Sequence, residues 1–129
     1  MSDPKVSNEI RKFLRANIES IGTLEVLAVF LNDKNRAWTA EDLRVAVHSS
    51  TQAIELHLKQ LLKMRAIARD AGTFKYAPYD ENLAKLLSDL NVAYVAFPKR
   101  IIEMIYNRTD QTIRDFSDAF KIRNDPDDD

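Results

Sequence analysis

Apolar residues recur at helical spacing through the first part of the chain. The spacing predicts a first helix over residues 8–21, which Ser7 caps and Gly22 ends. Its apolar stripe consists of Ile10, Phe13, Leu14, Ile18 and Ile21. Thr23 then opens a second helix, Leu24 to Leu31, which is apolar nearly all round. A helix of that kind is expected to be central and buried.

Two further helices are predicted, separated by a polar turn. Thr39 caps the first of them, Ala40 to Val47, and an acid three residues after the cap completes a capping-box pattern. The second runs to about Met64, and both serines of the turn, Ser49 and Ser50, are candidate caps for it. The sequence therefore predicts a short helix, a tight turn and a longer helix.

The hydrophobic period then changes from helical spacing to alternation. Residues 66–69 and 73–77 predict two short strands, and in the second strand Phe74 alternates with Lys75. A three-residue loop ending on Gly72 joins them, with the glycine where a positive φ is needed. The fold class predicted so far is mainly α with a small β-hairpin.

A long helix is predicted from Glu81 to about Tyr106, with apolar residues that step by four and three. This seam consists of Leu83, Leu87, Leu90, Tyr94, Phe97, Ile101 and Met104. Pro98 predicts a kink or break near residues 94–97. We expect the seam residues from Leu83 to Ile101 to form a dimer contact, and packing onto the rest of the chain is the alternative. A last helix is predicted from Thr109 or Asp110 to Phe120.

The composition excludes several kinds of chemistry. The 129 residues include no cysteine, which removes disulfides, thiol nucleophiles and thiolate metal sites. Two glycines, far apart in the sequence, cannot form a glycine-rich phosphate loop. The two histidines, His48 and His57, match neither a metal-binding nor a catalytic pattern. We therefore expect no enzyme activity, no cofactor and no metal.

The formal net charge of −1 is unevenly distributed. Four of the last five residues are aspartates, which predicts an acidic, disordered tail over residues 124–129. Without these four, 19 basic residues outnumber 16 acidic ones, so the rest of the chain is compatible with nucleic-acid binding. No signal-peptide pattern and no apolar run near the ~20 residues that span a bilayer occur, so we expect a cytoplasmic protein without membrane contact.

Between Thr23 and Ala77 the order of the predicted elements resembles a winged helix-turn-helix, as in regulators of the MarR and ArsR families. In these families the recognition helix typically runs straight into the first wing strand, as the segment from Leu61 to Ile67 does here. The stretch from Phe116 to Arg123 also resembles the ending of a group of uncharacterised bacterial winged-helix proteins, which brings no known activity with it.

The length of the chain fits one domain, which we expect over residues 1–124. A winged head, residues 23–77, would be flanked by an N-terminal helix over 8–21 and by C-terminal helices over 80–122. The helix Ala40–Val47 would support a recognition helix whose outward residues face the major groove of DNA. These residues are Ser49, Ser50, Thr51, Gln52, Glu55 and Lys59, while Arg69 and Lys75 would flank the wing.

Two features depart from the pattern of a DNA-binding winged helix. The wing tip around Ala71 has no basic residue, and Glu55 places a negative charge on the face expected to meet DNA. Two functions therefore stay open. The first is a transcriptional regulator that binds double-stranded DNA as a homodimer. The alternative is a winged-helix module or adaptor that binds a protein partner without specific DNA binding.

Overall fold

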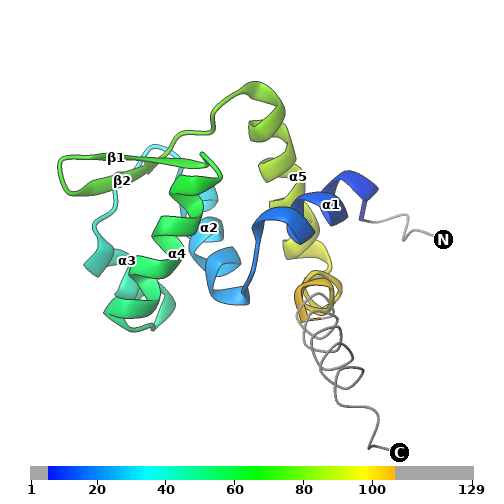
Figure 1. Ribbon diagram of the computed structural model, residues 1–129, viewed down its shortest axis with the longest axis horizontal. Coiled ribbons are helices and arrows are strands. Elements are labelled where there is room, and N and C mark those ends of the chain that lie inside the picture. Colours follow the sequence, from blue (N-terminus) through cyan, green and yellow to red (C-terminus); the bar gives the residue numbers. More distant parts are fainter. Residues whose placement is uncertain (1–5, 107–129) are drawn as a thin grey trace, which may run out of the picture.

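The computed structural model describes residues 6–106, which are mainly helical with one small antiparallel sheet (Figure 1). The named elements are α1 (Asn8–Asn17), α2 (Ile21–Asn32), α3 (Ala40–Val47), α4 (Thr51–Lys63), β1 (Ile67–Asp70), β2 (Thr73–Tyr76) and α5 (Glu81–Ala96). A further helical stretch covers residues 98–106. The predicted mainly helical chain with a small β-hairpin is therefore confirmed. The predicted last helix and the acidic tail lie outside the described residues.

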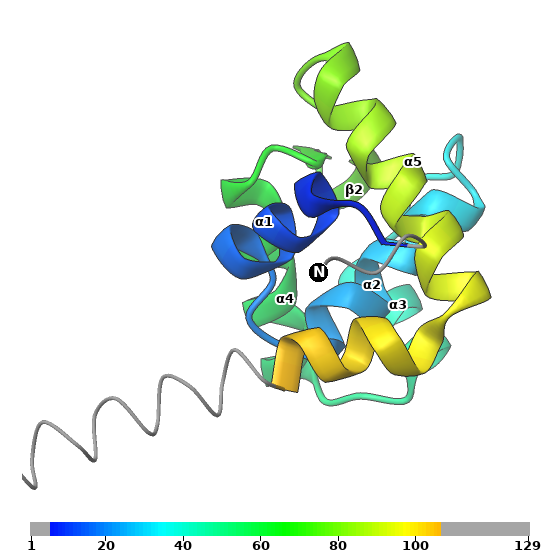
Figure 2. The ribbon, with the colours of Figure 1, turned by 90° about the vertical axis from the view of Figure 1, so that its right-hand side faces the viewer.

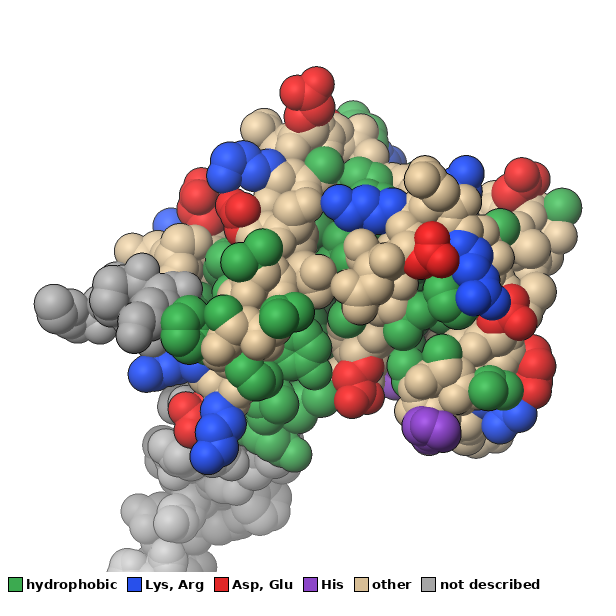
Figure 3. Space-filling view, turned by 180° about the vertical axis from the view of Figure 1, so that it is seen from behind, with side chains coloured by type: hydrophobic (Ala, Val, Ile, Leu, Met, Phe, Trp, Pro, Cys, Tyr) green, Lys and Arg blue, Asp and Glu red, His purple; other side chains and the backbone are tan. Residues whose placement is uncertain are grey.

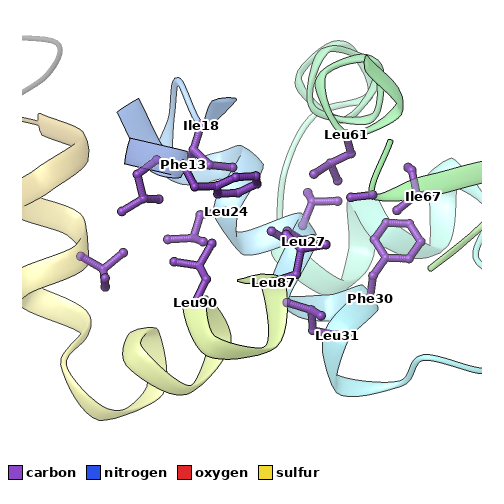
Figure 4. Close-up of a cluster of buried hydrophobic side chains, with 14 of the residues drawn as sticks. Phe13, Ile18, Leu24, Leu27, Phe30, Leu31, Leu61, Ile67, Leu87 and Leu90 are labelled. Atoms are coloured by element: carbon purple, nitrogen blue, oxygen red, sulfur yellow. The ribbon is translucent and has the colours of Figure 1, made fainter. Parts of the chain in front are cut away.

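α2 lies at the centre, as its apolar composition predicted. The α3–α4 pair and the hairpin lie on one side of α2, and α1 and α5 lie on the other (Figure 1). Leu27 and Phe30 of α2 are fully buried. Figure 4 shows Leu27 beside Leu87 of α5 and Phe30 beside Ile67 of β1. One hydrophobic cluster thus joins all seven named elements.

The boundary between α1 and α2 differs from the prediction. α2 begins at Ile21, because the Ser20 hydroxyl accepts a hydrogen bond from the Thr23 N–H at 3.2 Å and so caps the helix. Gly22 therefore lies inside the first turn of α2 and does not end a helix. Thr23 is not a cap, and its side chain is completely buried. Gly22 has a different role, a close contact with α4.

The α3–turn–α4 segment follows the caps that predicted it. Thr39 and Asp42 form a capping box, in which the Thr39 hydroxyl accepts from the Asp42 N–H at 3.0 Å and the Asp42 carboxylate accepts from the Thr39 N–H at 3.1 Å. His48 has a φ of 54° and reverses the chain after α3. Of the two candidate caps, Ser50 caps α4 by accepting from the Ala53 N–H at 3.1 Å.

β1 and β2 are joined by a two-residue turn. The turn residues Ala71 and Gly72 have φ angles of 50° and 86°, the positive pair that tight hairpins use. Asp70 pairs with Thr73, so the predicted three-residue loop was one residue too long. Because side chains alternate across a strand, this single residue changes which side chains share a face.

The predicted continuous helix over residues 81–106 is interrupted at Phe97, whose φ and ψ of −136° and 62° are not helical. Pro98 has no N–H to continue the hydrogen-bond ladder and crowds the preceding turn, so the break falls where the proline predicted it. Figure 2 shows residues 98–106 turning across the molecule at an angle to α5.

The heptad-like seam packs inside the chain. Leu87, Leu90 and Ile101 are fully buried in the hydrophobic cluster. The other three residues expected at a dimer contact, Leu83, Tyr94 and Phe97, are half-buried. A second copy cannot reach the three buried side chains, so the seam cannot form the expected dimer contact as a unit. Leu87 and Leu90 are buried because α5 packs against α1 and α2, and Ile101 is buried because the break at Phe97 turns residues 98–106 back onto the core.

Candidate nucleic-acid interface

α4 has one face in the core and one in solvent. Ile54, Leu58 and Leu61 are buried and fix the inner face. The outward residues are Thr51, Gln52, Glu55, Leu56, Lys59 and Lys63. Four of the residues predicted to face DNA therefore share one exposed stripe, which we call the α4 outer face.

The two serines before α4 occupy different environments. Ser50 is exposed, but its hydroxyl is used to cap the helix. Ser49 is half-buried, and its N–H donates to the Arg44 carbonyl at 3.0 Å. The uncapped N–H groups of the first turn of α4 place the positive end of the helix dipole at this surface. Thr51 and Gln52 carry the side chains nearest to it.

Two apolar residues on this side of the molecule were missed by the sequence analysis. Leu56 of α4 is 53% exposed, and Val45 of α3 is 56% exposed. The signal was present, because Leu56 falls outside the stripe of Ile54, Leu58 and Leu61 that faces the core. The α4 outer face is therefore amphipathic, with a leucine between Glu55 and the lysines.

The structure separates the two basic residues expected to flank the hairpin. Arg69 pairs with Phe74 across the strands, and its guanidinium lies 5.2 Å from the centre of that ring. Lys75 pairs with Ala68 and points to the opposite face of the hairpin. Arg69 and Lys75 therefore do not form one surface.

Four cations lie against aromatic rings in and around the hairpin, which sequence reasoning did not foresee. The pairs are Lys34 with Tyr76, Arg36 with Trp38, Arg65 with Tyr79 and Arg69 with Phe74, at 3.6–5.5 Å from the ring centres. Trp38 is also joined to β2, since its backbone N–H donates to the Phe74 carbonyl at 2.8 Å. These contacts hold positive charge along and around the hairpin.

Positive charge is concentrated between Lys34 and Lys75. This segment contains eight Lys or Arg residues and four Asp or Glu residues. The rest of residues 6–106 contains six basic and eight acidic residues. The near-neutral chain is therefore divided into a positive α3–α4–hairpin side and a slightly negative α1–α5 side.

Two of the four acids in the positive segment belong to local contacts on α3. A hydrogen bond from Arg44, with an N–O distance of 2.6 Å, lowers the pKa of Glu41. Hydrogen bonds from Thr39 lower the pKa of Asp42, which also lies 3.6 Å from Arg36. Glu55 is the acid that remains on the α4 outer face.

A buried polar cluster beneath this face fixes α4 on α2. The Thr23 hydroxyl lies 3.0 Å from His57 Nδ1 and also donates to Gln60 Oε1. Because that hydroxyl has one proton, His57 Nδ1 is the donor in the first contact. Burial lowers the pKa of His57, against the opposing effect of Glu25, and so favours the neutral imidazole.

The chain matches no protein-family model, no curated protein and no solved structure. Within residues 6–106, no three His, Cys, Asp or Glu side chains lie close enough together to hold a metal ion. Every helix in the same range is too short or too polar to cross a bilayer.

Proposed function

We propose that the chain is a winged helix-turn-helix protein that binds double-stranded DNA as a transcriptional regulator. In this proposal α3 is the supporting helix, α4 the recognition helix and the β1–β2 hairpin the wing. The observation that supports it most directly is the α4 outer face. This face is exposed and largely polar, and it belongs to the segment with twice as many basic as acidic residues.

The proposed contacts follow from positions on α4. Gln52 lies in the first turn, where an amide can hydrogen-bond to N6 and N7 of an adenine in the major groove. Lys59 and Lys63 lie one turn apart further along the helix and would meet phosphates. Lys75, on the solvent face of the hairpin, would meet the backbone of the flanking DNA.

A fluorescence anisotropy titration against genomic fragments at low salt tests the proposal. We expect Gln52→Ala to weaken binding to preferred fragments and Lys59→Ala to weaken binding to all of them. Lys85→Ala is the matched control, because Lys85 is on α5 and pairs with Asp89. Absence of binding, or binding unchanged by Gln52→Ala combined with Lys59→Ala, contradicts DNA recognition by α4.

The proposal includes a homodimer. Two copies would place their α4 helices in successive major grooves, about 34 Å apart on B-DNA. Because Leu87, Leu90 and Ile101 are buried within one chain, the contact between copies must use another surface.

A protein partner on the same face is the second candidate function, and exposed Leu56 and Val45 favour it. Glu55→Gln and Leu56→Ser distinguish the two. If DNA binds, Glu55→Gln tightens binding at low salt by removing a repelled charge. If the face binds a protein partner instead, Leu56→Ser weakens binding of that partner, and neither the wild type nor the variant binds DNA.

A further inference from the structure

The outward side of α5 changes from charged to apolar along the helix. In the first half, Lys85 forms an ion pair with Asp89 at 2.9 Å. In the second half, Val92 and Val95 are 67% and 72% exposed. Figure 3 shows hydrophobic side chains gathered on the α1–α5 side of the molecule. Val92 and Val95 are three residues apart and so share one face of α5, and exposed apolar side chains that share a face form a candidate contact surface.

A cavity of about 280 Å³ lies beside these valines, between the start of α1 and the end of α5. Ile10, Val92, Ala93, Ala96 and Phe97 form its apolar wall, and Asp89 adds a charged edge. A cavity of about 150 Å³ holds one benzene ring. The α5 cavity therefore has room for one or two aromatic side chains.

We propose that this cavity and the two valines receive the C-terminal segment of a second copy of the chain. Twenty-three residues follow Tyr106 in the sequence. Among them Ile113, Phe116 and Phe120 recur at helical spacing, which gives an apolar stripe with two aromatic rings. The stripe and the cavity match in character and in size.

The charge of residues 98–106 favours a second copy over the same chain. Lys99, Arg100 and Glu103 are exposed on this stretch, which directly precedes the C-terminal segment. A segment that folded back within one chain would lie along these charges on its way to the cavity. A segment from a second copy approaches from outside, and mutual exchange fills both cavities in a closed two-fold dimer.

This inference names the surface for the homodimer of the proposed function and does not depend on DNA binding. It is tested by cross-linking, for which the cysteine-free chain is well suited. A Val92→Cys protein is mixed with a tagged Phe116→Cys protein, oxidised mildly and separated by size. Asp118→Cys is the matched control, because residue 118 lies on the opposite side of the predicted helix from Phe116.

We expect the covalent heterodimer to form about 100-fold faster with Phe116→Cys than with Asp118→Cys, because docking raises the effective concentration of the two thiols. Equal rates overturn the proposal. A link that forms only when both cysteines are in one chain, and leaves that chain monomeric, also overturns it.

Light scattering gives a second measurement. The wild-type mass should be twice the 14.8 kDa of one chain. Phe116→Asp combined with Phe120→Asp should halve it, and Gln52→Ala on α4 should leave it unchanged. A wild-type protein at the mass of one chain overturns the dimer, whereas loss of DNA binding with the dimer intact overturns only recognition by α4.

Discussion

The backbone of Gly22 on α2 lies directly against the imidazole of His57 on α4. A Cβ atom added at Gly22 would lie 2.3 Å from His57 Nε2. This close approach brings the neighbouring Thr23 hydroxyl within 3.0 Å of His57 Nδ1. The orientation of α4, the proposed recognition helix, therefore depends on two features of α2. Gly22 has no side chain to push α4 away, and the buried Thr23 hydroxyl contacts His57.

Gly22→Ala should destabilise the protein, although alanine is the better helix former. The gain in helix propensity is about 1 kcal/mol. Overpacking against a buried ring costs about 1–3 kcal/mol, so we expect a net loss in the free energy of unfolding. Urea denaturation followed by circular dichroism measures it.

The control is Gly22→Ala in a protein from which the His57 imidazole has been removed. In a His57→Ala background, Gly22→Ala should become neutral or stabilising by up to about 1 kcal/mol. If Gly22→Ala is equally destabilising with and without the imidazole, the contact between Gly22 and His57 is not the cause.

The buried histidine predicts a pH dependence of stability. Burial holds the pKa of His57 below its ordinary value of 6.5, so the unfolded chain takes up a proton at a higher pH than the folded chain. Stability should therefore fall as the pH drops below about 6.5 and should be unaffected by this group above it. Urea midpoints at pH 7.5 and 5.5 measure the change, and His57→Gln should lose this part of it. An equal fall in both proteins excludes His57 as the source.

The elements that the sequence predicted well are those fixed by short-range signals. The capping box at Thr39 and the serine turn before α4 are set by residues three apart, and both were visible in the pattern. The start of α2 was missed although its cap, Ser20, is a local signal, because Gly22 was interpreted as a helix stop, and its actual role depends on His57, 35 positions away in the sequence. No local pattern contains that contact.

The hairpin shows how a small error in a turn moves a predicted site. With a three-residue loop, Arg69 would pair with Thr73, and Arg69 and Lys75 would share one face. The observed two-residue turn pairs Arg69 with Phe74 and sends Lys75 to the other face. Residue types alone predicted the hairpin, but the φ angles of Ala71 and Gly72 decide the register.

Ser50 and Thr51 provide a matched pair of hydroxyls at the start of α4. Ser50 accepts from the Ala53 N–H at 3.1 Å, whereas exposed Thr51 is the first residue of the helix and does not cap it. Ser50→Ala should cost about 1 kcal/mol of stability, and Thr51→Ala should change it by less than about 0.5 kcal/mol. Thermal or urea unfolding of the two variants checks the difference. Equal effects would show that the capping hydroxyl of Ser50 contributes no more to stability than the exposed hydroxyl of Thr51.

Leu90 and Val92 lie two residues apart on α5, and substitution by alanine should destabilise the fold only at Leu90. Leu90 is fully buried, so Leu90→Ala should destabilise the fold by about 2–5 kcal/mol at any protein concentration. Val92 is 67% exposed within one chain, so Val92→Ala should leave the stability within about 0.5 kcal/mol at a protein concentration too low for the proposed dimer to form. Urea denaturation at two protein concentrations measures both. A Leu90→Ala protein that is well folded and monomeric would restore the idea that this position serves a dimer contact.

The salt dependence of DNA binding tests the role of the α4 lysines more sharply than affinity alone. Each phosphate contact that a lysine makes adds about 0.9 to the slope of log affinity against log salt concentration. Lys59→Ala and Lys63→Ala should therefore each reduce the slope by about that amount. Lys85→Ala removes the same charge from the α5 side, where Lys85 pairs with Asp89, and should leave the slope unchanged. If all three variants change the slope equally, binding follows the total charge of the chain and not the α4 outer face.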